Sequence, residues 1–356
     1  MANQVLYGFH NLKDMAAARI TGTNVEAVND AINMAVAEHN RTIDALMSLF
    51  VQRTTNYTER YAQISAAQLQ PLDDNGRALP IKPAGYYSVG YPIQAGGSAW
   101  GANYVTRAKM TVADAERATA MMLTADANWM RAHILSGLFA AATWTFVDDL
   151  YGSITVQPLA LASDGVTYGV VGTGVPATDT HQLAQANAIG ASADNPFPII
   201  RAELLEHPQN SGDVIVFLPT GLKATTVALT TFNPIADPNI QAGSGTDRLV
   251  GTLGVQTPGT LIGYEDSGVW IVEWPMLPAN YMVAVTTGGD APLAMREDPE
   301  PELQGFKRVA DRDNHPFYES QWLRRAGFGA RNRVGAVVYR IGNGTYAVPT
   351  GYTPPI

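Results

Sequence analysis

The chain has 356 residues, of which 46% are hydrophobic and only 15% are charged, and its formal net charge is −9. An acidic chain is poorly suited to a dedicated nucleic-acid-binding role, because such proteins neutralise phosphates with clustered Lys and Arg. The absence of cysteine excludes disulfides, thiolate metal sites and cysteine nucleophiles. The charged share lies well below the roughly 25% of an average globular domain, which favours a chain that covers part of its surface with other chains.

The N-terminal region carries no export signal and one strong helix signal. Residues 1–20 lack the basic segment and apolar core of a signal peptide, and no apolar run in the chain approaches the roughly 20 residues of a membrane helix. We therefore expect a soluble protein made in a cytoplasm. Apolar residues three or four positions apart predict a helix over 24–53, with a capping box of Thr23 and Glu26.

Residues 70–108 combine many prolines and glycines with aromatic residues and carry little apolar mass. An Asn-Gly pair at 75–76 is a strong hairpin signal, and strand-like composition recurs at 85–93 and 103–110. Long loops inside compact domains are usually functional or disordered, and the aromatic residues argue against disorder. We predict an extended, two-stranded projection from the body of the protein.

The longest predicted helix covers residues 112–146. Thr111 and Asp114 form its capping box, and small or apolar residues line two stripes at helical spacing. About 35 residues at 1.5 Å each span about 50 Å. Many of the stripe residues are alanines, so other elements can approach this helix closely.

Residues 150–290 have the mixed pattern of an α/β body. Short continuous apolar runs predict three buried strands, at 213–219, 269–274 and 281–287. Helices are predicted at 195–207, where prolines occupy the first turn, and at 220–232. Residues 264–268 are expected to form a hairpin turn.

The chain after residue 290 is rich in strand signals. Prolines in 291–306 predict an extended edge element, because Pro is tolerated mainly at sheet edges. Two further strands are predicted at 318–329 and 333–341. The glycines of this region are expected to permit close backbone approach or a bend; they are Gly327, Gly329 and Gly335.

Residues 324–333 alternate arginines with glycines and first suggest a phosphate-binding loop. Asn332 stands where a dinucleotide-binding motif needs its third glycine, and a strand rather than a helix follows, so this interpretation fails. The arginines are instead expected to pair with the acids of 297–319 or with another chain. They are Arg324, Arg325, Arg331 and Arg333.

Candidate catalytic and metal-ligating residues are sparse. Glu203, Glu206 and His207 share one helical turn and form a possible metal cluster, although we favour the exposed end of an amphipathic helix. Residues 311–315 begin like a calcium loop but lack its glycine and its final glutamate. No nucleophile, base and orienting group come together in the sequence. We therefore expect no catalytic, cofactor-binding or metal-binding residue.

The order of these elements resembles the major capsid proteins of tailed bacteriophages, whose HK97 fold is shared with encapsulin shells. The amino-acid sequence of residues 265–349 is similar to that of the C-terminal half of many such proteins. The resemblance implies an α+β, HK97-like capsid fold. It implies the following parts: an N-terminal arm with an amphipathic helix at 1–60, an extended β-hairpin E-loop at 61–110, the spine helix of the P-domain at 111–149, an A-domain at 150–290, P-domain strands and P-loop at 291–333, and a final A-domain strand with the C-terminal tail at 334–356.

The resemblance also implies a structural protein without enzymatic activity. Copies of it are expected to assemble in the cytoplasm of a host bacterium into the hexamers and pentamers of an icosahedral head that encloses double-stranded DNA. Cement or scaffolding proteins and the portal are candidate partners, with at most nonspecific contact to packaged DNA and no membrane. Two alternatives stay open: an encapsulin-type compartment shell, and a metal-dependent hydrolase that uses Glu203, Glu206 and His207.

The resemblance places candidate intersubunit contacts mainly in the E-loop. They are Arg77, Lys82, Tyr86, Tyr87, Trp100, Arg308 and Arg312. Some family members crosslink an E-loop lysine to an asparagine of another subunit, and Lys82 is the only lysine within 70–108. No pattern identifies an acceptor, so this chemistry is not carried over. We expect deletion of 76–100 to leave a foldable body that assembles poorly.

Overall fold

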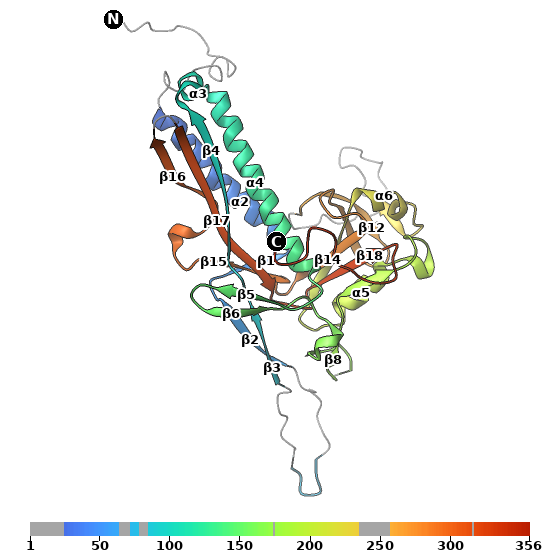
Figure 1. Ribbon diagram of the computed structural model, residues 1–356. Helices are drawn as coiled ribbons and strands as arrows, with labels where there is room; N and C mark the ends of the chain where they lie inside the picture. Colours follow the sequence, from blue (N-terminus) through green and yellow to red (C-terminus); the bar gives the residue numbers. More distant parts are fainter. Residues whose placement is uncertain (1–24, 64–71, 78–84, 174, 235–256, 315–316) are drawn as a thin grey trace, which may run out of the picture. The chain divides into compact units, whose positions relative to one another are not determined.

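The computed structural model describes residues 25–63, 72–77, 85–173, 175–234, 257–314 and 317–356 (Figure 1). The chain forms two compact units. Unit 1 consists of Met1–Asp44, Gln94–Arg131 and Asp298–Ala326, and unit 2 consists of Ala45–Ile93, Ala132–Glu297 and Gly327–Ile356. None of the helices in the described part of the chain has the length and apolar character that a membrane crossing requires.

Unit 1 contains two long helices that lie along an antiparallel sheet (Figure 1). Strand β17 occupies the middle of this sheet, with β4 on one side and β16 on the other. The elements are α2 (Val25–Met47), β4 (Gln94–Asn103), α3 (Tyr104–Lys109), α4 (Val112–Phe139), η4 (Pro301–Leu303), β16 (Lys307–Asn314) and β17 (Phe317–Ala330), of which α2, α4 and β17 have their last residues in unit 2.

The core of unit 1 joins both helices to the sheet. Val36 of α2 and Met122 of α4 pack with the rings of Phe306 and Trp322. These two rings are stacked with their centroids 5.6 Å apart. Trp100 of β4 adds a partly buried ring to the same cluster.

Unit 2 contains a seven-stranded sheet in the order β11-β12-β13-β10-β14-β18-β9. The strands are β9 (Gln182–Gln185), β10 (Ser211–Leu218), β11 (Phe232–Pro234), β12 (Thr260–Glu265), β13 (Val269–Glu273), β14 (Tyr281–Gly288) and β18 (Ala336–Ile341). Helices α5 (Phe197–Leu205) and α6 (Thr220–Val227) contribute Phe197, Ile200 and Leu222 to its core. Five successive residues of β10, from 214 to 218, are buried, so both faces of the central strands are covered.

Further strands complete unit 2. β1 (Val51–Thr54) runs parallel to β15 (Leu293–Glu297), and β2 (Thr58–Gln63) forms an antiparallel hairpin with β3 (Gly85–Gly90). The remaining elements are β5 (Trp144–Asp148), β6 (Gly152–Val156), η2 (Ala162–Asp164), β7 (Thr167–Tyr168), β8 (Ala177–Thr178) and η3 (Ser192–Asp194).

Most elements with strong local signals form as predicted. The structure confirms the three buried strands of 150–290, both helices of that region, the hairpin turn at 264–268 and the strands at 318–329 and 333–341. The capping box of α4 is also confirmed, because Asp114 N donates to Thr111 Oγ1 at 3.3 Å and Thr111 N donates to Asp114 Oδ2 at 3.1 Å. The Thr23 and Glu26 box lies outside the described side chains.

The two long helices both end earlier than predicted. Residues 51–54 leave the helical path and pair with β15, while the Phe50 ring packs 5.0 Å from Phe217. Residues 144–148 pair with β6 around a turn in which Asp148 Oδ1 accepts from the Leu150 and Tyr151 amides. In both places, tertiary pairing outweighs the helical periodicity.

Three further expectations are wrong. Residues 104–109 form helix α3 rather than a strand, because Asn103 Oδ1 caps it by accepting from Thr106 N at 2.7 Å. β15 is not an edge strand, since it lies between β1 and β17, and its five residues are buried. A deletion of 76–100 is not a benign truncation, because it removes most of β4, which pairs with β17 along ten residues.

Candidate functional site

The arginines of 324–333 form ion pairs inside their own chain. Arg324 and Arg333 are among the largest fully buried side chains of the described residues. Four acids receive them: Asp126 pairs with Arg324 at 2.5 Å, Asp298 with Arg325 at 3.3 Å, Glu59 with Arg331 at 3.4 Å, and Asp164 with Arg333 at 2.5 Å. Only Asp298 falls within 297–319, so three of the four expected pairings are wrong. The tertiary fold brings acids from distant segments next to β17 and next to residues 331–333, which follow it.

Arg324 anchors the polar centre of unit 1. Its Nε and one terminal nitrogen donate to the two carboxylate oxygens of Asp126, at 2.5 and 2.7 Å, and that terminal nitrogen also donates to Asn40 Oδ1 at 2.9 Å. His39 Nε2 lies 2.8 Å from the same carboxylate. Burial alone raises the pKa of Asp126, but the hydrogen bonds from His39 and Arg324 outweigh it and lower that pKa below its ordinary value.

This lowered pKa predicts acid sensitivity in unit 1. The Asp126 carboxylate stabilises the fold fully above its ordinary pKa of about 3.8 to 3.9. The contribution disappears as the pH falls through the still lower folded-state pKa. We expect the free energy of unfolding, measured from pH 6 to pH 2.5 by chemical denaturation, to fall less steeply in Asp126→Asn than in the wild type. An unchanged slope contradicts the assignment.

The described candidate intersubunit residues differ in exposure. Arg77 is exposed beside a turn closed by Gly76 N donating to Asp73 O, which confirms the turn predicted at 75–76. Tyr86 is 56% exposed beneath the guanidinium of Arg60.

Three of the other candidates make contacts inside their own unit. Tyr87 stacks on Tyr61 at 5.6 Å, Trp100 packs in the core of unit 1, and Arg308 donates to Asn29 at 3.1 Å. Lys82 and the side chain of Arg312 lie outside the described residues. The candidates remain predictions, and Arg77 and Tyr86 are the two whose exposure suits a contact.

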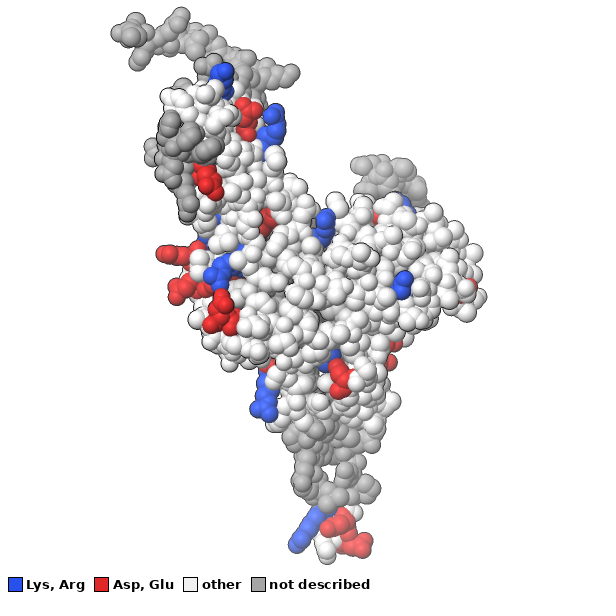
Figure 2. Space-filling view, in the orientation of Figure 1, with Lys and Arg blue, Asp and Glu red and all other residues white. Residues whose placement is uncertain are grey.

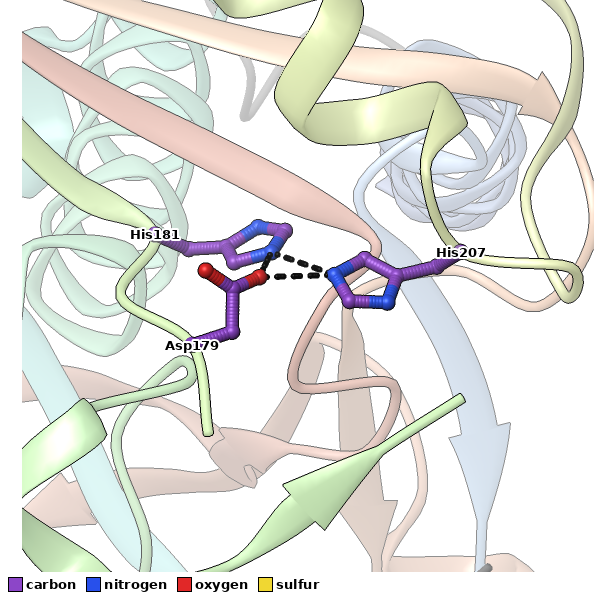
Figure 3. Close-up of side chains that lie close together, drawn as sticks. All are labelled: Asp179, His181 and His207. Carbon is purple, nitrogen blue, oxygen red and sulfur yellow. Dashed lines mark hydrogen bonds and ion pairs between the residues drawn. The ribbon is translucent and has the colours of Figure 1, made fainter. Parts of the chain in front are cut away.

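A second polar cluster lies in unit 2 and was missed at the level of the sequence (Figure 3). Asp179 and His181 precede β9, and His207 follows α5. Both Nε2 atoms lie 2.7 Å from Asp179 Oδ2 and 3.1 Å from each other. Both imidazoles are fully buried. The only sequence signal was the short Asp-Thr-His stretch at 179–181.

Backbone carbonyls determine the tautomers in this cluster. His181 Nδ1 lies 2.8 Å from the carbonyl oxygen of Ala336, and His207 Nδ1 lies 2.9 Å from that of Gly169. A carbonyl oxygen accepts only, so each Nδ1 carries a hydrogen and donates. Each Nε2 is therefore the atom that can accept a proton or bind a cation. The arrangement is chemically suited to hold positive charge at one buried point.

Glu203 of α5 and Glu206, which directly follows this helix, lie close to the cluster of Asp179, His181 and His207. Burial and then the charge of Asp179 raise the pKa of Glu203 to about 8. Glu206 Oε1 lies 3.7 Å from His207 Nε2. Burial lowers the pKa of His207, but the hydrogen bond to Asp179 outweighs it and raises that pKa above its ordinary value. The favoured interpretation of 203–207 as an exposed helix end is therefore wrong for His207, whose buried ring also contacts Asp179 and His181 of another segment.

An apolar groove of about 510 Å³ separates α2 from α4 in unit 1. Small side chains line much of it, among them Ala31, Ala35 and Ala115. The alanine stripe of α4 thus leaves apolar surface accessible between the two helices. The face seen in Figure 2 also carries only scattered charged side chains.

No protein-family model matches the chain, and no curated protein sequence is similar to it. Solved structures are similar. A chain from the structure titled "Mycobacterium phage Patience" superposes with a TM-score of 0.68 and 20% identity, over 99% of this chain and 98% of that one. A chain from the capsid structure of the cyanophage P-SCSP1u superposes with a TM-score of 0.51 and 9% identity, over 83% and 87%. The likeness shows that this chain has the predicted α+β, HK97-like capsid fold.

Proposed function

We propose that this chain, which has the HK97-like capsid fold, is the major capsid protein of a tailed bacteriophage. Many copies assemble into the hexamers and pentamers of an icosahedral head around double-stranded DNA. The observation that carries the proposal is the likeness over nearly the full length of both chains to the structure from a mycobacteriophage. A fold alone does not imply function, so the surface of the chain must also suit assembly.

The β2–β3 hairpin supports a role in assembly. It consists of two strands that pair with each other, from Thr58 with Gly90 to Gln63 with Gly85. The burial of β2 alternates between exposed and half-buried positions. A two-stranded hairpin is marginally stable alone in water. Its own unit covers part of it, including Val89, and contact with a neighbouring copy supplies cover for the exposed positions.

The groove of unit 1 and the low charge content support the same proposal. An apolar groove bordered by alanines accepts an apolar segment of another chain at little desolvation cost. We propose that subunits contact one another through the hairpin and through unit 1. We also propose that the chain contacts cement or scaffolding proteins and the portal, and that it contacts packaged DNA nonspecifically. Under this proposal the protein is located in the virion and has no enzymatic activity.

Electron microscopy of the purified full-length chain tests the proposal. We expect shells or isolated capsomers, in the absence or presence of a scaffolding protein. A strictly monomeric chain at high concentration under both conditions contradicts it. Particles that contain a cargo enzyme instead of DNA, when isolated from their natural source, favour the encapsulin-type alternative.

A shortened hairpin separates folding from assembly. Residues 64–84 are replaced by Asn-Gly, which closes a two-residue turn between the paired Gln63 and Gly85. Because β2 and β3 keep their register, we expect the melting temperature to stay within a few degrees of wild type while shell yield falls at least tenfold. Shells are counted by sedimentation and microscopy, and wild-type yield from the shortened chain refutes the role of the hairpin.

A further inference from the structure

We propose that Asp179, His181 and His207 bind one divalent transition-metal ion, Zn²⁺ or a close relative, inside unit 2. Metal binding at this site is independent of the proposed shell-forming role. It replaces the expectation from the sequence that the chain binds no metal. The observation that carries it is the convergence of three ligand atoms from two segments on a single buried point (Figure 3).

The spacing of the three atoms suits a small cation. The two Nε2 atoms are 3.1 Å apart, and each lies 2.7 Å from Asp179 Oδ2. Ligands at right angles around an ion with bonds of about 2.1 Å lie about 3.0 Å apart, and tetrahedral ligands lie about 3.4 Å apart. The 2.7 Å pairs therefore need to separate by about 0.3 Å around an ion with right-angle ligands, or by about 0.7 Å around a tetrahedral one. A cation above their plane contacts all three.

The second layer of hydrogen bonds is the kind that metal-binding histidines have. His181 Nδ1–H donates to the carbonyl oxygen of Ala336 at 2.8 Å, and His207 Nδ1–H donates to the carbonyl oxygen of Gly169 at 2.9 Å. Such bonds fix the tautomer and ring orientation in metal sites. They leave three lone pairs, two of nitrogen and one of oxygen, facing one another in a buried space. A metal ion satisfies all three at once.

The ligand types select the class of metal. Two imidazoles with one carboxylate suit borderline ions such as Zn²⁺, Co²⁺, Ni²⁺ and Fe²⁺, whereas Mg²⁺ and Ca²⁺ prefer oxygen ligands alone. Glu206 Oε1, which is 3.7 Å from His207 Nε2 on a side chain 38% exposed, can turn in as a further ligand or yield to water. The 14% exposure of the Asp179 side chain leaves an entry path for the ion.

The ion crosslinks segments that are far apart in the sequence. The ligands and their carbonyl partners belong to the loop after β7, the segment before β9, the end of α5 and the start of β18. Bound metal stabilises the folded state over the unfolded chain by mass action. The site is therefore structural, and its readout is the stability of unit 2.

The test uses the untagged, full-length chain after treatment with a chelator. We expect one equivalent of Co²⁺ per chain to bind with visible ligand-field absorption and to be displaced by Zn²⁺. At a free Zn²⁺ concentration 100-fold above the dissociation constant, we expect the melting temperature to be roughly 5–10 °C higher than in the presence of chelator. Equal melting temperatures with Zn²⁺ and with chelator, and no saturable Co²⁺ signal, overturn the proposal.

Matched variants assign the ligands. His181→Asn and His207→Asn keep an amide donor near the position of Nδ1 and remove Nε2, so each is expected to lose at least tenfold in metal affinity. His39→Asn is the control, because His39 also contacts a buried carboxylate, Asp126, but has no second imidazole in that contact. Wild-type affinity in both ligand variants, or an equal loss in the control, overturns the assignment even if one variant folds poorly.

Discussion

Replacing Arg324 with Met is expected to lower the free energy of unfolding of unit 1 by about 3–5 kcal/mol, because it leaves the Asp126 carboxylate buried without its main partner. Arg324 is 2% exposed and bonds Asp126 through two nitrogens. The hydrogen bond from Arg324 to Asn40 is lost as well, although Asn40 Oδ1 still accepts from Phe306 N at 3.0 Å. The loss is measured by chemical denaturation and by hydrogen exchange of the α4 and β17 amides.

The adjacent arginine provides the control. Arg325 precedes the same glycines but its side chain is 36% exposed, and it lies 3.3 Å from Asp298. An exposed ion pair contributes about 0–1 kcal/mol, so Arg325→Met is expected to change little. The double variant Arg324→Met with Asp126→Leu should recover part of the loss, since it removes the buried charge as well. Equal losses for Arg324→Met and Arg325→Met contradict the role given to Arg324.

Replacing Gly327 with Ala is expected to prevent normal folding of unit 2 or to lower its free energy of unfolding by more than about 4 kcal/mol. A Cβ atom at this position lies 1.5 Å from the carbonyl oxygen of Pro92 and 2.4 Å from its carbonyl carbon. Both are backbone atoms, so no side-chain rotation relieves the overlap, and the strand itself must shift. Soluble yield and the denaturation midpoint measure the effect.

A glycine of α6 gives the opposite expectation. A Cβ added at Gly221 meets no atom within 4 Å. Gly221→Ala reduces the freedom of the unfolded chain and is expected to be neutral or to stabilise by up to about 1 kcal/mol. A wild-type midpoint for Gly327→Ala contradicts the proposed overlap. Gly329, whose added Cβ lies 2.6 Å from the carbonyl oxygen of Gly90, shows that the same close approach continues along β17.

The glycines of 324–333 were interpreted correctly from the sequence, but the partners of three of the four arginines were not. A glycine between two strand-forming runs signals close backbone approach, whatever lies opposite. An arginine signals only that a partner exists. The structure supplies partners on α4, on β2 and after β6, namely Asp126, Glu59 and Asp164. Counting nearby acids in the sequence therefore identified only Asp298.

The cluster of Asp179, His181 and His207 shows the same limit. The sequence groups His207 with Glu203 and Glu206, its neighbours on one helical turn. The favoured interpretation of that pattern was an exposed helix end. In the folded unit its imidazole is buried against Asp179 and His181, which the sheet brings to it from 26 to 28 residues away. A residue pattern on one helix cannot reveal a ligand on another segment.

The sequence by itself determined the elements whose causes are local. The capping box at Thr111, the apolar runs of β10, β13 and β14, and the proline-started α5 depend on residues within a few positions of one another. Tertiary structure alone decided where α2 and α4 end, that β4 pairs with β17, and which acid receives each arginine. These outcomes depend on pairs such as Arg324 and Asp126, 198 positions apart. Their contact is set by strand order, which hydrophobic periodicity does not encode.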